Sequence, residues 1–87
     1  MRGVCYEHQA DAALQTARTF WSRANDAVET LEWALSRDPE IGTPIVAGAT
    51  VRVAVFGGAK SVGLPTVLCT YEVNATGGLV IYDLEFS

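Results

Sequence analysis

Three side chains in the second half of the chain could act on a phosphate or bind a carboxylate. Arg52 and Lys60 are the only basic residues after Arg37. Together with Tyr71 or Tyr82 they could form a small cationic site, because guanidinium and ammonium groups pair with phosphate and carboxylate oxygens. Arg52 and Lys60, with Tyr71 or Tyr82, are therefore candidate residues of a small anion-binding site, and solvated surface charge is the alternative interpretation.

The glycine-rich segment around Lys60 does not match a nucleotide-binding loop. In Gly57-Gly58-Ala59-Lys60-Ser61, alanine rather than glycine precedes the lysine. A strand pattern follows it, whereas a phosphate-binding loop leads into a helix. We interpret this segment as a flexible loop between two strands.

Few other side chains suit acid–base chemistry. His8 is the only histidine and lies beside Glu7 near the N-terminus, which is typical of a solvated surface residue. Glu72, Asp83 and Glu85 fall in strand patterns. They could serve as acid and base if their environments separated their pKa values, but solubilising an exposed face is the simpler role.

The two cysteines, Cys5 and Cys69, have no zinc-ligand spacing. We expect neither a metal nor a cofactor. Two buried thiols in a reducing cytosol are the first interpretation of the pair, and a disulfide between them is the alternative.

The charge of the chain argues against broad nucleic-acid binding. Its formal net charge is −4, with only six basic residues scattered along 87 positions, whereas proteins that track phosphates cluster lysine and arginine. The sequence contains no apolar run long enough to cross a membrane and no signal-peptide pattern at its start. We therefore expect a cytoplasmic protein without membrane contact.

Apolar residues recur at helical spacing through the N-terminal half, after a possible short first strand at residues 3–8. The stripe comprises Ala10, Ala13, Leu14, Ala17, Phe20, Trp21, Ala24, Val28, Leu31 and Leu35. A break near Ser22–Asn25, with a capping box from Asp26 to Glu29, favours two helices at about 8–22 and 26–37. A single long helix is the alternative, and Pro39 predicts the stop.

Three strand patterns make up the C-terminal half, after a connecting loop at 38–49. They cover residues 51–56, 66–73 and 79–86, and the last two are joined by a tight turn at 74–78. Strict alternation in the last strand would place Val80, Tyr82, Leu84 and Phe86 on one face. The chain is thus predicted to be one α+β domain, residues 1–87, with a helical hairpin packed on a three- to four-stranded antiparallel sheet.

Trp21 and Trp33 differ in their positions on the helical stripe. Trp21 fits the predicted core, whereas Trp33 falls off the stripe and is expected to be partly exposed. An exposed tryptophan can anchor a partner. Trp33, Arg37 and Tyr82 are therefore the candidate partner-binding residues, and ordinary packing at the sheet edge is the alternative for Trp33.

Several stretches together resemble one family. They are Leu31-Glu32-Trp33-Ala34-Leu35-Ser36-Arg37-Asp38-Pro39 followed by Gly42-Thr43-Pro44, then Val51-Arg52-Val53, and finally Val67–Val73 with Leu79–Leu84. In this order they are similar to the second helix, exit loop, first central strand and terminal hairpin of the RelE/ParE superfamily of small bacterial toxins. The resemblance covers about residues 20–86.

The resemblance implies a toxin restrained by a cognate antitoxin that wraps it with a helix and an extended segment. Members of the family either cleave messenger RNA on the ribosome or inhibit DNA gyrase. The cleaving members carry several basic residues on the central strands, where this chain has Leu68 and Thr70. We therefore expect a toxin-like protein that binds a cellular protein target.

Two alternatives follow from the same resemblance. One is a weak ribosome-dependent endoribonuclease that uses Arg52, Lys60 and Tyr71. The other is a non-toxic binding or dimerising module that keeps the fold. Exposed strands at the edges of a short sheet make a homodimer plausible in either case.

Overall fold

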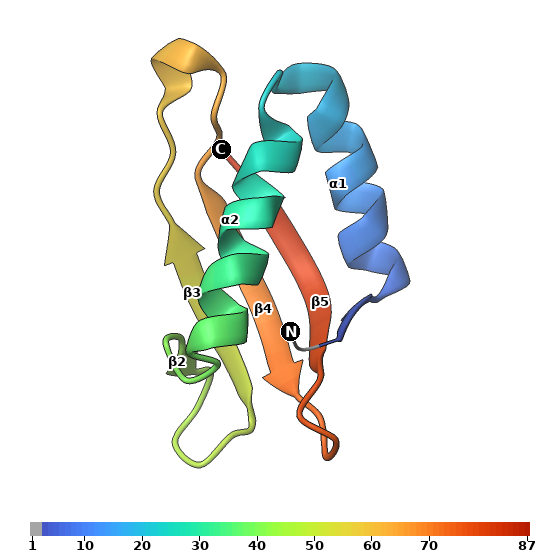
Figure 1. Cartoon of the computed structure of the whole chain (residues 1–87), viewed down its shortest axis with the longest axis vertical. Helices are drawn as coiled ribbons and strands as arrows, with labels where there is room; N and C mark the ends of the chain where they lie inside the picture. Colours follow the sequence, from blue (N-terminus) through green and yellow to red (C-terminus); the bar gives the residue numbers. More distant parts are fainter. Residues whose placement is uncertain (1–2) are drawn as a thin grey trace.

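A computed structural model describes residues 3–87, which form two helices and five strands. In chain order the elements are β1 (Val4–Tyr6), α1 (His8–Phe20), α2 (Ala24–Arg37), β2 (Thr43–Pro44), β3 (Val51–Phe56), the 3₁₀ turn η1 (Lys60–Val62), β4 (Val67–Val73) and β5 (Leu79–Phe86). Both helices lie on one face of the sheet (Figure 1). The α+β class, the helical hairpin and the short first strand are confirmed.

The sheet has the strand order β1-β5-β4-β3-β2. Neighbouring strands from β2 to β5 are antiparallel, whereas β1 runs parallel to β5. The two helices between β1 and the later strands provide the long crossover that a parallel pair needs. The sheet is therefore mixed and has one strand more than the sequence predicted, because the two residues of β2 pair within the expected loop.

The helical hairpin bends where the sequence placed the break. α1 ends at Phe20 and α2 begins at Ala24, so the single long helix is wrong. The capping box is also wrong, because Arg23 occupies the N-cap position and Asp26 lies inside the first turn. Asp26 instead pairs with Arg23 Nε at 2.9 Å, and a carboxylate there still favours the positive end of the helix.

The core lies between the helices and the sheet. Leu31 and Leu35 of α2 are fully buried and belong to one cluster with the buried residues of α1 and the strands. The other members of that cluster are Ala10, Leu14, Ala27, Val28, Ala54, Val67, Cys69, Tyr71, Leu79, Ile81 and Leu84. One buried cluster thus joins both helices to the sheet.

The end of α1 departs from the predicted stripe. Phe20 is 77% exposed and Trp21 is half-buried, although the periodicity placed both in the core. Ala17 is the last buried position of α1, and the chain turns toward α2 directly after Phe20. Phe20 therefore lies beside the last residues of β5, in a groove rather than under the second helix.

A bulge in β5 overturns the predicted alternation. Thr70 pairs with Asp83 but Tyr71 pairs with Ile81, so Tyr82 is an extra residue. An extra residue reverses the side on which the following side chains point. Ile81 and Leu84 both face the helices as a result, and the prediction that Tyr82 and Leu84 share a face is wrong.

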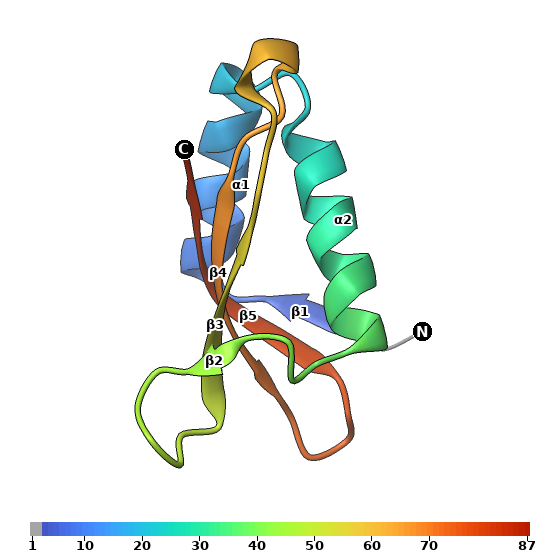
Figure 2. The same ribbon diagram turned by 90° about the vertical axis from the view of Figure 1, so that its left-hand side faces the viewer.

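The sheet face turned away from the helices forms a second surface, which we call the open face. Buried Ala54, Cys69 and Tyr71 face the core, so the residues that alternate with them point the other way. The open face comprises Val51, Val53, Val55, Leu68, Thr70, Glu72, Val80, Tyr82, Asp83 and Glu85. The turned view shows α2 running alongside the strands on the opposite side (Figure 2).

Candidate functional site

Arg52 and Tyr71 lie directly opposite each other on β3 and β4. Arg52 Nη1 donates to the backbone carbonyl of Gly42 at 2.7 Å. Tyr71 Oη donates to the carbonyl of Pro39 at 2.7 Å and accepts the Gly42 N–H at 3.0 Å. Both side chains therefore hold the loop that leaves α2, and the fully buried Tyr71 has no surface from which to reach a substrate.

Burial raises the pKa of Tyr71, against smaller opposing effects of the Gly42 backbone and Arg52. The phenol therefore remains a hydrogen-bond donor over the physiological range. A neutral, doubly hydrogen-bonded phenol inside the core stabilises the loop, and it is poorly placed to act as a general base.

Lys60 is separated from these two residues. It is exposed in η1, beyond the end of β3 that lies farthest from β2 (Figure 1). Arg52 and Phe56 alone are separated by about 13 Å along the strand. The structure thus brings Arg52 and Tyr71 together and leaves Lys60 apart, so the three candidates do not form one cationic site.

Tyr82 takes part in a small network on the open face. Its hydroxyl donates to Glu72 Oε1 at 2.6 Å, and Thr50 donates to the other carboxylate oxygen. The hydrogen bond from Thr50, and to a smaller extent the one from Tyr82, lowers the pKa of Glu72. The hydrogen bond to Glu72 in turn raises the pKa of Tyr82. Sequence reasoning missed this network, because the pairing depends on strand register and on the bulge.

Trp33 and Arg37 lie one turn apart on the outer side of α2. Arg37 stacks its guanidinium carbon 4.7 Å from the centroid of the Trp33 ring, a distance typical of a cation–π contact. Trp33 is 59% exposed, which confirms the prediction that it falls off the buried stripe. Tyr82 belongs to the open face, so the three candidate partner-binding residues lie on two separate surfaces.

The open face combines aliphatic and acidic side chains. Val55 is 65% exposed on it, and the other aliphatic members lie on the neighbouring strands. Its charged members among residues 3–87 are Glu72, Asp83 and Glu85, since Arg52 points to the helix side. A surface of this composition repels phosphates and suits apolar contact with a protein.

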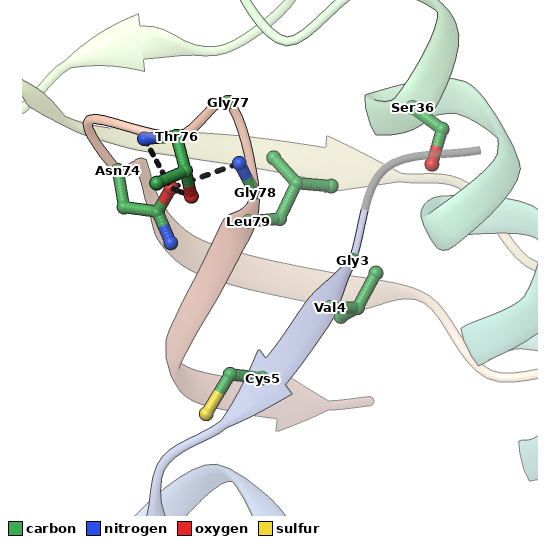
Figure 3. A pocket seen from close by; sticks show the side chains of 9 residues that line it. All are labelled: Gly3, Val4, Cys5, Ser36, Asn74, Thr76, Gly77, Gly78 and Leu79. Carbon is green, nitrogen blue, oxygen red and sulfur yellow. Dashed lines mark hydrogen bonds between the residues drawn. The ribbon is translucent and has the colours of Figure 1, made fainter.

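A wide hollow of about 760 Å³ lies between β1 and the turn that joins β4 to β5. Figure 3 shows Asn74 with its amide oxygen turned into that turn. This oxygen accepts hydrogen bonds from Thr76 N–H at 3.1 Å, Thr76 Oγ1 at 2.8 Å and Gly78 N–H at 2.9 Å. The amide oxygen of Asn74 thus stabilises the turn, and these three donors occupy its hydrogen-bonding capacity.

Both cysteines are free thiols, so the alternative of a disulfide is wrong. Cys69 is fully buried. Its burial, with a smaller contribution from the negative charge of the Asp83 carboxylate, raises the pKa of its thiol to about 12. Cys5 is exposed, which corrects the expectation that both thiols are buried. Within the described part of the chain, no group of three or more His, Cys, Asp and Glu side chains could hold a metal ion.

Comparisons with protein-family models, with curated proteins and with solved structures found no match for this chain. The helices of residues 3–87 are too short or too polar to span a bilayer. The surfaces described above therefore carry the functional argument, and the open face is the most distinctive of them.

Proposed function

We propose that this chain is a toxin-like, RelE/ParE-type component of a type II toxin–antitoxin pair, which acts in the cytoplasm by binding a protein. Its partners are then a cognate antitoxin and a cellular target protein, with inhibition of gyrase as the family precedent. The element order supports the proposal, because a helical hairpin precedes three antiparallel strands in the same chain.

The observation that favours protein binding over RNA cleavage is the composition of the open face. Cleavage of RNA requires cations or donors aimed at the charge that develops on phosphorus. The described residues of the open face supply valines and carboxylates instead. Arg52 is engaged with the carbonyl of Gly42 on the other side of the sheet, and Lys60 lies apart from it.

The test is induced expression in a bacterial host, with and without any small reading frame that overlaps or abuts this gene. We expect growth arrest that the neighbour relieves and no site-specific cleavage in mapped transcripts. Val55→Lys should relieve the arrest, because it places a charge on the open face at an exposed position. Val62→Lys is the matched control, since Val62 is 54% exposed but lies in η1.

Lys60→Ala separates the two mechanisms further. Under the proposal it leaves growth arrest unchanged, whereas a nuclease that uses Lys60 would lose activity. Absence of arrest at high expression would overturn the toxin-like role. Site-specific transcript cleavage that Arg52→Ala abolishes, while the variant remains folded by circular dichroism, would replace protein binding with the endoribonuclease alternative.

A further inference from the structure

The outer edge of β3 is covered along only part of its length. β2 pairs with β3 at Arg52 and Val53, and Ile45 donates its N–H to the carbonyl of Val51 at 3.1 Å. The main chain of Val51 therefore points to this outer side. Within residues 3–87, no strand pairs with that side of β3 beyond Val53, and this edge faces the viewer in Figure 2.

Two residues of the uncovered part turn main-chain groups to solvent. Main-chain direction alternates along a strand, so the N–H and C=O groups of Val55 point to the same side as those of Val51. Gly57 continues the alternation, because the N–H of Gly58 turns inward to Thr66 Oγ1. Gly57 is exposed and has no side chain, so its exposed surface is main chain. The edge thus offers two donors and two acceptors.

The sequence of this edge lacks the usual protection against pairing. Edge strands of soluble proteins commonly carry charged side chains or proline, which oppose contact with another strand. Residues 53–59 contain neither, and Val55 is 65% exposed. An uncharged edge with free main-chain groups is suited to pairing with another strand.

We propose that two copies of this chain pair antiparallel through their β3 edges and form one continuous sheet. The pairing is centred on Phe56, which lies opposite Phe56 of the second copy. Val55 of each copy then lies opposite Gly57 of the other, and each of these two pairs exchanges both main-chain hydrogen bonds. All four free groups of each edge are satisfied in this register. The inference does not depend on the proposed function.

The side chains along the edge suit this register. On the open face, Val55 lies opposite a glycine, which leaves it room. On the helix side, the two Phe56 rings lie across a non-hydrogen-bonded pair, where side chains approach most closely and aromatic pairs stabilise a sheet. A small recess of about 30 Å³ beside Phe56 and Gly57 is also lined by Leu64 and Pro65, so the incoming ring meets apolar surface.

The charge distribution favours a second copy over a charged peptide as the occupant. The chain has a net charge of −4, but the carboxylates of the open face lie on β4 and β5. The new strand pair therefore brings no like charges together, whereas a basic segment would find no carboxylate on residues 53–59. Because the two-fold axis is perpendicular to the sheet, both open faces lie on the same side of the dimer.

Sedimentation of the purified chain over a range of concentrations tests the association. We expect the mean molar mass to rise with concentration from that of one chain toward that of two. Val55→Pro should weaken the association about ten- to a hundredfold, because the symmetry removes two main-chain hydrogen bonds at once. Proline is tolerated on an edge strand where the N–H faces solvent, so the monomer should remain folded by circular dichroism. Val55→Thr is the matched control, since it keeps the N–H and the branched shape and should associate like the wild type.

Amide hydrogen exchange of the wild-type chain locates the interface without any variant. The amides of Val55 and Gly57 should exchange more slowly as concentration rises. A molar mass that stays at one chain would overturn the dimer. Slower exchange confined to Val4–Tyr6, or an association that a folded Val55→Pro leaves intact, would overturn the β3 edge as the site. Neither measurement uses growth arrest, so the result is separate from the test of the proposed function.

Discussion

The Tyr71 hydroxyl accepts the backbone N–H of Gly42 at 3.0 Å, across 29 positions of sequence. The same hydroxyl donates to the carbonyl of Pro39, and the Gly42 carbonyl accepts from Arg52 at 2.7 Å. One tyrosine and one arginine from paired strand positions thus fix the exit of α2. Two of the three candidate catalytic residues therefore have a structural task in this molecule.

Tyr71→Phe should destabilise the protein. It removes both hydrogen bonds of the hydroxyl and leaves the buried Gly42 N–H without its acceptor, which costs about 1–3 kcal/mol of unfolding free energy. Urea unfolding followed by circular dichroism measures the change. Tyr82→Phe is the control, because its hydroxyl bonds to a surface carboxylate and its loss should be smaller. Equal losses in the two variants would contradict the structural role of Tyr71.

Gly42→Ala should also destabilise the fold, by about 1–3 kcal/mol for an overpacked site. A Cβ at Gly42 would lie 2.7 Å from Tyr71 Oη and 2.9 Å from the carbonyl oxygen of Val53. Gly57→Ala is the matched control, because nothing lies within 4 Å of a Cβ there. Thermal unfolding compares the two variants, and a midpoint for Gly42→Ala equal to that of the control would refute the close approach.

Alkaline pH should weaken the fold through Cys69. Burial raises the pKa of its thiol from about 9 to about 12, so the neutral form is favoured in the folded state. The associated stability is fully present below about pH 9 and is lost as pH rises toward 12, at up to about 1.4 kcal/mol per pH unit. Burial also raises the pKa of Tyr71, which acts in the same direction.

The measurement is urea unfolding at a series of pH values above 9. Cys69→Ala should make the decline of unfolding free energy shallower, whereas Cys5→Ala, which removes the exposed thiol, should preserve the wild-type decline. Thiol labelling gives an independent check, because Cys5 should react in the folded protein and Cys69 only after unfolding. Identical declines in the two variants would contradict this assignment.

The local sequence pattern was sufficient to predict the elements in which apolar residues recur at regular spacing. The bounds of β3 and β5 were predicted as they are observed, because alternation and turn residues mark both ends. The helix break near Ser22–Asn25 was also predicted, because the apolar stripe is too long for one helix in a small domain. These features depend on neighbours in sequence.

Features that depend on register were not predictable. The bulge at Tyr82 leaves no mark in the sequence, yet it decides which side chains of β5 reach the core. The pairing of Arg52 with Tyr71, and of both with the loop at Gly42, arises only when distant strands align. The residue types of Arg52 and Tyr71 suggested that they bind an anion. Their positions in the sheet instead make them hydrogen-bond to the backbone of the loop after α2.

Under the proposed function, Trp33→Ala should weaken binding of the proposed antitoxin with little change in stability. Trp33 is 59% exposed and stacks under Arg37, so its loss should change the unfolding free energy by about 0.5 kcal/mol or less, as for ordinary surface sites. The Arg37 guanidinium restricts the orientation of the exposed Trp33 ring, and an exposed tryptophan of this kind is a typical anchor at a protein interface. Thr30→Ala on the same exposed side of α2 is the control, and binding is measured by calorimetry with the proposed antitoxin, a small protein encoded next to this gene. Unchanged affinity in Trp33→Ala would remove the outer side of α2 from the interface and leave the open face as the surface that binds.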